Sequence, residues 1–127
     1  MLTYSQTIGI FTMPDGTTYH GHAGKGAGLN NPEMQNVHGV GPLPQGLYNL
    51  ETWKDGSAYS AEDARLGPFV CRLDPDPANE MYGRNGFFLH GGDGSNPPTD
   101  SEGCIVLFRA AREAIAATGE TQLTVVA

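Results

Sequence analysis

The sequence predicts a mainly β fold with one C-terminal helix. Its 127 residues include 18 glycines and 9 prolines, a composition that favours short strands joined by turns over a helical bundle. Short apolar stretches recur along the chain, whereas only one segment near the C-terminus has the periodicity of a helix. The length is enough for one well-buried core without metals or disulfides, so we expect a single domain over residues 1–127.

The first predicted elements are strands at the N-terminus. Residues 2–6 and 7–13 read as strands, a turn follows at "PDG", and residues 17–22 read as the next strand. Residues 23–46 are dominated by glycine, asparagine and proline and predict a long loop. Loops of more than about 15 residues are uncommon in compact domains, so we expect this loop to be either functional or disordered.

The remainder of the chain predicts five more strands, separated by polar segments rich in turn residues. In the strand that contains "PFVCRL", Phe69, Cys71 and Leu73 alternate with other residues and are therefore expected on one face. The simplest interpretation of Cys71 is a small buried apolar side chain. The five strands cover residues 47–53, 68–73, 87–90, 104–107 and 122–126.

The predicted helix covers residues 108–118. Phe108, Ala111 and Ile115 recur at the spacing of one helix face, so we expect them to share an apolar face. Gly119 follows directly and suits the left-handed position that commonly ends a helix.

The charge balance excludes several classes of partner. Seven basic and fourteen acidic residues give a net charge of -7, and no cluster of Lys and Arg is present, so we expect no binding to nucleic acid. No apolar run approaches the length of a membrane span, so we expect no membrane insertion. The start of the sequence has neither the basic nor the apolar region of a signal peptide, which predicts synthesis in the cytoplasm.

A histidine and a cysteine stand at the two ends of the polar loop between two predicted strands. "FFLH" ends in His90, and "SEGC" brings Cys104 to the start of the next strand. A cysteine is a good nucleophile only as the thiolate, and a nearby histidine commonly lowers its pKa. Gly103 lets a carbonyl approach the backbone, whose amides can stabilise an oxyanion. The pattern is typical of a cysteine acyl transferase or hydrolase.

Two alternatives concern the histidines. A zinc site would recruit His20, His22 and His38 with either Cys104 or His90, but the sequence contains no compact ligand pair of the zinc-finger or His-x-x-x-His type. We therefore expect no metal and no other cofactor. His90 could also be a polar residue at a strand end that is hydrogen-bonded to the neighbouring loop.

The chain resembles the small L,D-transpeptidase effector family of type VI secretion systems. The resemblance covers "GHAGKGAGLNNPEMQNVHGVGPLPQGLYNL", "LGPFVCRLDPDP", "MYGRNGFFLHGGD", "SEGCIVL" and "RAAREAIAATG". The family signature is a histidine that ends a strand, followed by Ser-x-Gly-Cys, and it maps onto His90, Ser101, Gly103 and Cys104. The resemblance implies an L,D-transpeptidase-like β-sandwich or barrel with one C-terminal helix.

Two positions depart from the family pattern. The chain reads His-Gly-Gly-Asp where the family commonly has His-Gly-Asp, and His22 stands where relatives often have tyrosine. Glu102 stands where the larger L,D-transpeptidases usually have histidine, and in this it is like many of the small effectors. Arg84 and Asn85 are candidates to hold a carboxylate of the substrate, although Arg84 could equally be a solvated turn residue. The predicted substrate-binding residues are Arg84, Asn85, Gly91, Asp93, His22 and Glu102, with the loop from Gly24 to Gly46 as a wall of the pocket.

The resemblance also implies a reaction and a biological setting. Cys104 would attack the L-centre carbonyl of meso-diaminopimelate in a peptidoglycan tetrapeptide stem and release D-alanine, with His90 as the base and then the acid. The amides of Gly103 and Cys104 would hold the oxyanion, and Ser101 or a nearby carbonyl would orient His90. Hydrolysis gives L,D-carboxypeptidase activity, and a free D-amino acid gives exchange. The enzyme would be secreted and act in the periplasm of a target bacterium.

Further partners and other functions follow from the same resemblance. A cognate immunity protein and a secretion-system carrier are candidate partners, in addition to the stem peptides of peptidoglycan. A non-catalytic module that binds the wall is the alternative from another functional class. A prophage enzyme or an enzyme that remodels the cell's own wall is a further alternative.

Overall fold

The computed structural model of the chain describes residues 1–55, 67–92 and 100–127. In these residues nine strands form one sheet, accompanied by two short 3₁₀ helices and one α-helix. The strands are β1 (Leu2–Ser5), β2 (Ile10–Thr12), β3 (Thr18–His20), β4 (His22–Ala23), β5 (Gly46–Leu50), β6 (Cys71–Pro75), β7 (Phe87–His90), β8 (Ile105–Val106) and β9 (Gln122–Val126). The helices are η1 (Gly26–Gly28), η2 (Pro32–Met34) and α1 (Arg109–Ala117).

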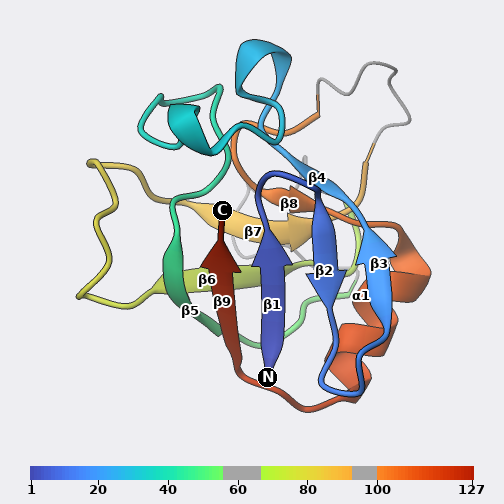
Figure 1. The fold of residues 1–127 in the computed structure, drawn as a ribbon. Coiled ribbons are helices and arrows are strands. Elements are labelled where there is room, and N and C mark those ends of the chain that lie inside the picture. The colour runs from blue at the N-terminus through green and yellow to red at the C-terminus, as the bar shows by residue number, and fades with distance from the viewer. Residues whose placement is uncertain (56–66, 93–99) are drawn as a thin grey trace.

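The sheet curls into a nearly closed barrel. Its strand order is β3-β2-β1-β9-β5-β6-β7-β8-β4, so the two end strands are consecutive in the chain and are joined at Gly21. In Figure 1, β1, β2, β3 and β9 stand upright at the front, and β6, β7 and β8 cross behind them. The prediction of a mainly β fold with one C-terminal helix is confirmed.

Two strand pairs in the sheet are parallel. β1 pairs with β9, and β7 pairs with β8 with Leu89 opposite Ile105 and His90 opposite Val106. Parallel neighbours cannot be joined by a tight turn, and residues 91–104 separate β7 from β8 in the sequence. The end of β7 and the start of β8 therefore belong to one continuous surface of the sheet.

The inner face of the barrel forms one apolar core. Leu2 on β1, Cys71 on β6, Leu89 on β7 and Leu123 on β9 are completely buried in it. Burial of a large aliphatic side chain contributes about 1.5–3 kcal/mol, so side chains of this kind hold the strands together. The core fixes the backbone positions from which the functional side chains project.

Helix α1 begins one residue later and ends one residue earlier than the predicted range of 108–118. Ala111 and Ile115 are buried in the core, and Gly119 has a φ of +70°, the left-handed conformation expected after a helix. Phe108 is different because its backbone is extended and its side chain is 55% exposed, with its ring 5.8 Å from that of Tyr19. The prediction that Phe108 packs on the buried helix face is wrong.

Within the described residues, no helix is long and apolar enough to cross a lipid bilayer.

Phe69 also departs from the prediction. Its φ of +57° is left-handed, so the strand predicted from residue 68 begins at Cys71, and only an isolated bridge joins Val70 to Lys54. The Phe69 ring stacks on Trp53 at 4.9 Å instead of sharing the core face with Cys71. A backbone that turns left-handed cannot continue the alternation of a strand.

The long loop predicted over residues 23–46 contains η1 and η2 and is tied to the barrel by glutamines. Gln6, completely buried after β1, donates through Nε2 to the carbonyl of Leu43 at 2.9 Å. The side-chain Nε2 of Gln45 donates to Gln6 Oε1 at 3.0 Å, and the backbone N–H of Gln45 donates to Gln35 Oε1 at 2.9 Å. Side-chain bonds of this kind give the loop a defined position although it has little secondary structure.

Candidate active site

The candidate site lies on the face of β7 that points away from the core. Successive strand residues point to opposite faces, and Phe87 and Leu89 belong to the core. Phe88 instead packs with Val70 in a small separate cluster, against which Cys104 also packs. His90 is two residues after Phe88 and therefore projects from the same face.

Cys104 reaches this face from the neighbouring chain segment. It directly precedes β8, and its Sγ accepts a hydrogen bond from the backbone amide of Phe88 at 3.3 Å. The thiol lies 3.8 Å from the carbonyl of Gly86, its acceptor. Cys104 is a free cysteine of intermediate exposure, so its thiol is open to reagents. Strand pairing thus brings Cys104 and His90 to one face of the sheet.

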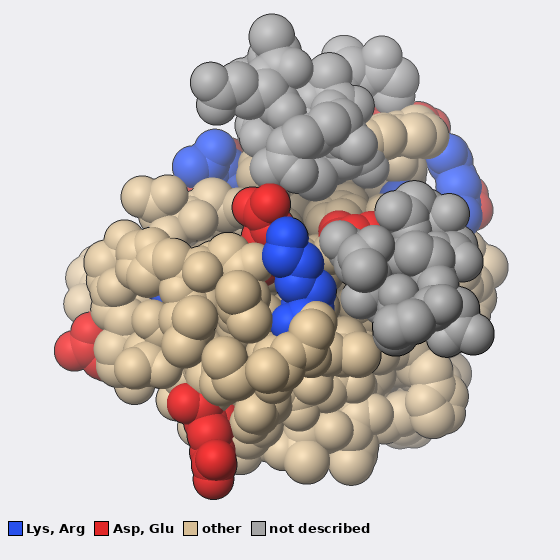
Figure 2. All heavy atoms as spheres, turned by 90° about the horizontal axis from the view of Figure 1, so that it is seen from above, with Lys and Arg blue, Asp and Glu red and all other residues tan. Residues whose placement is uncertain are grey.

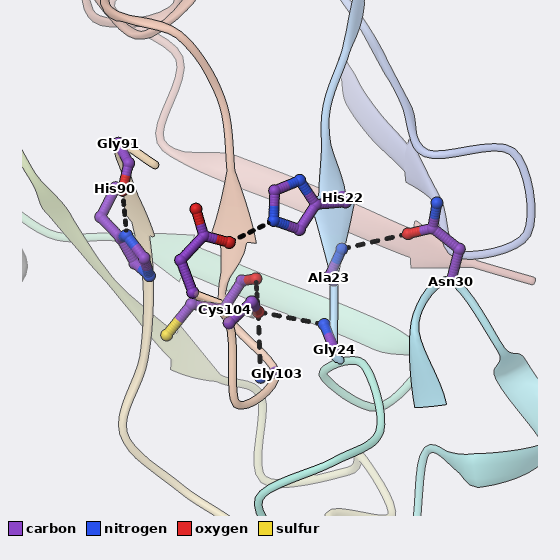
Figure 3. Close-up of polar contacts among 10 residues, drawn as sticks. His22, Ala23, Gly24, Asn30, His90, Gly91, Gly103 and Cys104 are labelled. Atoms are coloured by element: carbon purple, nitrogen blue, oxygen red, sulfur yellow. Dashed lines mark hydrogen bonds and ion pairs between the residues drawn. The ribbon is translucent and has the colours of Figure 1, made fainter. Parts of the chain in front are cut away.

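His90 is held by the backbone that follows it. Its Nδ1 lies 2.7 Å from the carbonyl of Gly91, and the residue is only 4% exposed. A carbonyl can only accept, so in the neutral ring Nδ1 carries the proton and Nε2 carries the lone pair. Figure 3 shows the bond to Gly91, and it shows the Cys104 sulfur on the side of its chain segment that faces His90. The ring is therefore prepared to take a proton at Nε2.

Cys104 and His90 line one cavity of about 320 Å³. Three predicted substrate-binding residues, Arg84, Asn85 and Glu102, line it as well. The predicted loop wall contributes to it, since His38 and Gly39 are among the lining residues. The full lining of described residues is His38, Gly39, Gly83, Arg84, Asn85, Gly86, Phe87, His90, Asp100, Glu102 and Cys104.

Ser101 fixes the turn that carries Cys104. Its buried Oγ donates to the carbonyl of Cys104 at 2.6 Å and accepts from the amides of Gly103 at 3.1 Å and Gly24 at 3.0 Å. Of the two predicted ways to orient His90, the structure therefore has the nearby carbonyl, that of Gly91, and uses Ser101 for the turn. The Gly103 N–H is bonded to Ser101 in this conformation, so its predicted role in holding the oxyanion stays a prediction.

Gly103 is required by both conformation and space. Its φ of +137° is one that residues with a side chain rarely adopt. A Cβ at this position would lie 2.6 Å from the ring of Phe87 and 2.7 Å from Nη2 of Arg84. The glycine predicted from the signature thus allows the turn to pack directly on the layer beneath it.

Arg84 has a different environment from either predicted one. It is 6% exposed, so it is not a solvated turn residue. Nη1 donates to the carbonyls of Gln35 and Pro42, and Nη2 donates to those of Gly41 at 2.9 Å and Glu102 at 3.0 Å. These four bonds use all four terminal N–H groups of the guanidinium. The guanidinium is thus already bonded to the backbone, and a bond from Arg84 to a substrate carboxylate stays a prediction.

Asn85 and Glu102 lie at the mouth of the cavity. Asn85 is exposed, and the Glu102 side chain is 64% exposed with Oε1 3.8 Å from Nζ of Lys25. Both side chains are free to turn toward a bound molecule, so their substrate-binding roles stay predictions. Asp93 lies outside the described residues.

A histidine–aspartate pair adjoins the site. His22 Nε2 lies 2.6 Å from Oδ1 of Asp100, with only 18% and 9% of the two side chains exposed. Figure 3 shows the His22 ring engaged by this contact on the side of the Cys104 segment away from His90. Asp100 lines the cavity with Cys104 and also an adjacent hollow with His22 and Gly91. The predicted residues His22 and Gly91 thus line the adjacent hollow, which shares Asp100 with the cavity, and their substrate-binding roles stay predictions.

Sequence reasoning did not find Asp100. It lies in a polar loop with other acidic residues, and its partner is far away in the sequence. The pairing of His22 with Val106 across β4 and β8 is what brings the two side chains together. A motif that reads only neighbouring residues contains no signal for such a pair.

The described residues provide no metal site, and the face seen in Figure 2 has no basic patch in its described part. None of their His, Cys, Asp and Glu side chains gather in a group of three or more that could hold a metal ion, which counts against the zinc alternative. On the face shown in Figure 2, acidic and basic side chains are scattered among uncharged residues, without a continuous basic patch in the part that is described. The cavity itself contains both signs of charge.

Comparisons with known proteins identify the family. The family model of the Tlde1 domain matches residues 17–127. Among solved structures, the crystal structure of L,D-transpeptidase 1 from Mycobacterium tuberculosis is similar, with a TM-score of 0.53 and 18% sequence identity. The likeness covers 99% of this chain and 58% of that chain, so this chain spans little more than half of its structural relative. A comparison with curated proteins gave no match.

These findings agree with the motifs read from the sequence. At 18% identity the structural likeness shows the fold alone, and that fold is L,D-transpeptidase-like. The family match extends over most of the chain, including the segments that carry His90 and Cys104. The chain belongs to the Tlde1 domain family, the small L,D-transpeptidase effectors of type VI secretion systems.

Proposed function

We propose that the protein is a cysteine-dependent L,D-carboxypeptidase that also exchanges D-amino acids on the tetrapeptide stems of peptidoglycan. The observation that carries this proposal is the shared cavity, in which a free thiol and an imidazole project from the same face of the sheet. Membership of the Tlde1 family supports peptidoglycan as the substrate. The solved relative is named an L,D-transpeptidase, and its activity comes to this chain only as part of the proposal.

The first half of the reaction forms a thioester. His90 Nε2 takes the proton of the Cys104 thiol, and the sulfur attacks the carbonyl at the L-centre of meso-diaminopimelate. The C–N bond to D-alanine then breaks, and the imidazolium returns its proton to the leaving amine. The bond from Nδ1 to the Gly91 carbonyl supports this step because it stabilises the protonated ring.

The second half resolves the thioester. Water attacks and gives the tripeptide stem, or the amine of a free D-amino acid attacks and gives a new tetrapeptide. Both outcomes remove donors that cross-linking enzymes need. Of the two amides predicted to stabilise the oxyanion, that of Cys104 is the stronger candidate, because the Gly103 amide is bonded to Ser101.

Mass spectrometry of stem peptides tests the reaction. Purified protein is incubated with tetrapeptide muropeptides, with and without an isotope-labelled D-amino acid. We expect loss of the terminal D-alanine in the first sample and incorporation of label in the second, and neither with Cys104→Ala. Binding of muropeptides without conversion by the wild-type protein would support the non-catalytic wall-binding alternative.

We also propose that the protein is an antibacterial effector that acts in the periplasm of a target cell. Its family of type VI effectors supports this role, in which a carrier delivers the protein and an immunity protein protects the producer. Three strains test it: one with the protein in the cytoplasm, one with an added export signal, and one exporting Cys104→Ala. We expect swelling or failed division only in the second. Equal toxicity of the first or third strain would contradict the proposal.

A further inference from the structure

Arg84 lies directly beneath the turn that carries Cys104. Its Nη2 donates to the carbonyl of Glu102, two residues before the nucleophile, and to that of Gly41 in the cavity loop. The same nitrogen lies 2.7 Å from the place where a Cβ on Gly103 would be. One guanidinium group thus touches both the turn and the loop whose residues His38 and Gly39 line the cavity.

The second terminal nitrogen extends the contact along the loop. Nη1 donates to the carbonyl of Pro42 at 2.8 Å and to that of Gln35. The ring of Phe87 on β7 lies under the guanidinium, 5.1 Å from ring centroid to Cζ. A planar group with fixed donors suits this arrangement, because it joins three chain segments in one geometry. Lysine has a single ammonium group and cannot make the same four bonds.

Arg84 also brings a buried positive charge to the site. Burial lowers the pKa of the Arg84 guanidinium, while the charges of Tyr48 and Cys104 act in the opposite direction. An arginine in this position still remains protonated near neutral pH. Its charge is therefore present whenever the thiol of Cys104 ionises, and burial protects the interaction from screening by salt.

Other charged and titratable groups near Cys104 also favour or oppose ionisation of its thiol. His90 from β7 and His38 from the cavity loop line the cavity, and Asp100 and Glu102 add carboxylates that oppose a thiolate. Arg72 on β6 lies over the ring of Phe88, but it is 40% exposed and is near Glu51 and Asp74. Of the two arginines, Arg84 is the one whose charge is buried beneath the turn.

We propose that Arg84 is a positioning residue with two effects on the nucleophile: it holds the Cys104 turn against the cavity loop, and its charge favours the thiolate of Cys104. The inference concerns the same cavity as the proposed function and rests on Cys104 being its nucleophile. The first effect acts through the backbone of Glu102 and Gly103, and the second acts through space. Different substitutions at one position can separate them.

The pH dependence of alkylation by iodoacetamide measures the second effect. The experiment uses the full chain with Cys71→Ala, so that Cys104 is the thiol being alkylated. We expect Arg84→Met to raise the midpoint of the profile by about one pH unit. Arg84→Lys keeps a charge, so its midpoint should lie closer to that of the parent protein. Unchanged midpoints in both variants would overturn the charge effect.

Arg112 provides the matched control. It is also 6% exposed and donates to the backbone carbonyls of Leu107, Pro68 and Phe69, but it is not among the described residues that line the cavity. Arg112→Met therefore removes a buried arginine of the same kind, and we expect the midpoint for Cys104 to stay within about 0.3 of the parent value. A shift equal to that of Arg84→Met would overturn the specific role of Arg84.

The first effect is measured as the alkylation rate of the thiolate above its midpoint. We expect both Arg84→Met and Arg84→Lys to change this limiting rate, since both lose the four bonds that position the turn. A limiting rate equal to that of the parent protein in both variants would overturn the positioning effect. Alkylation needs no peptidoglycan, so failure of this inference is distinguishable from failure of the proposed reaction.

A measurement without substitution of Arg84 covers the case in which its variants do not fold. In the wild-type protein the ¹⁵N resonances of the Arg84 guanidinium should shift with pH at the midpoint of Cys104 alkylation. The shift should disappear in Cys104→Ser, which keeps the shape of the side chain and does not ionise in this range. Resonances that move equally in both proteins, or in neither, would overturn the inference.

Discussion

The two cysteines lie on opposite sides of one strand and have opposite properties. Cys71 on β6 pairs with Leu89 of β7 and is completely buried in the core. Cys104 packs on Phe88, the residue before Leu89, and lines the cavity. A shift of one residue along β7 changes the face of the sheet and with it the chemistry available to a thiol.

The surroundings of Cys71 keep its thiol protonated. Burial, followed by the charge of Glu51, raises the pKa of the Cys71 thiol to about 12. Its Sγ donates to the backbone carbonyl of Glu51 at 3.1 Å. Cys104 instead accepts a bond from the Phe88 amide and has a buried arginine behind its turn. In this fold the reactivity of a thiol therefore depends on the face of the sheet on which the cysteine lies.

The largest expected difference between the two sides is in catalysis. Cys104→Ala should lower the rate of D-alanine release by more than about 10³-fold, whereas Cys71→Ala should keep it within about 3-fold. His90→Ala should lose as much as Cys104→Ala, and the double variant should be little worse, because base and nucleophile act as a unit. The rates are measured by mass spectrometry of tetrapeptide muropeptides.

Two outcomes would contradict the roles of Cys104 as nucleophile and His90 as base. Full activity of folded Cys104→Ala would remove the proposed nucleophile. High activity of His90→Ala would move the base to another residue, with His22 and His38 as the next candidates. Circular dichroism of each variant confirms that the fold is present before its rate is interpreted.

Thiol labelling gives the second difference. At pH 7.5 Cys104 should react with iodoacetamide more than about 100-fold faster than Cys71, since only exposed and ionised thiols react. Mass spectrometry of digested protein assigns the label to each position, and urea should make the two rates similar. Equal rates in the folded protein would contradict the assignment of Cys71 to the core.

Much of the difference between Cys71 and Cys104 could be predicted from the sequence. Alternation in "PFVCRL" indicated a buried Cys71, and the polar loop before Cys104 indicated an accessible thiol. The class of fold followed from many glycines and prolines between short apolar segments, a property of the whole chain. These features depend on local pattern, which a sequence displays directly.

What the sequence did not predict depends on contacts between distant segments. The four carbonyls around Arg84 come from residues 35–42 and 102, and no local pattern shows that they converge. The pair of His22 and Asp100 needs the pairing of β4 with β8. The prediction for Phe69 was wrong for a different reason. A left-handed φ at an aromatic residue is rare, and the sequence contains no signal for it here.

Substitution of Gly103 tests the packing beneath the turn that carries Cys104. Gly103→Ala combines an unfavourable φ with a Cβ that collides with Phe87 and Arg84, and should cost about 3 kcal/mol in free energy of unfolding. Gly119→Ala is the matched control, because Gly119 also has a positive φ but no atom within 4 Å of its added Cβ. It should cost about 1 kcal/mol. Urea unfolding measures both, and equal costs would show that packing under the turn is loose.

The smallest expected effect is a loss of stability at alkaline pH that is caused by the Cys71 thiol. Its folded pKa of about 12 lies above the value of an unfolded cysteine, about 8.5, so the unfolded state releases the proton first. The stabilisation is therefore fully present below about pH 8.5 and is lost as the pH rises toward the folded pKa. Between pH 7 and pH 9.5 the wild-type protein should lose about 1 kcal/mol more free energy of unfolding than Cys71→Ala.

Cys104→Ala separates this effect from other alkaline titrations. Burial also raises the pKa of Tyr4 and Tyr48, but these residues are present in all three proteins and cancel in the comparison. Urea unfolding at both pH values should therefore show the wild-type loss again in Cys104→Ala and a smaller loss in Cys71→Ala. If Cys104→Ala gave the smaller loss instead, Cys104 would be the thiol that folding keeps protonated, and the two sides of β7 would have exchanged roles.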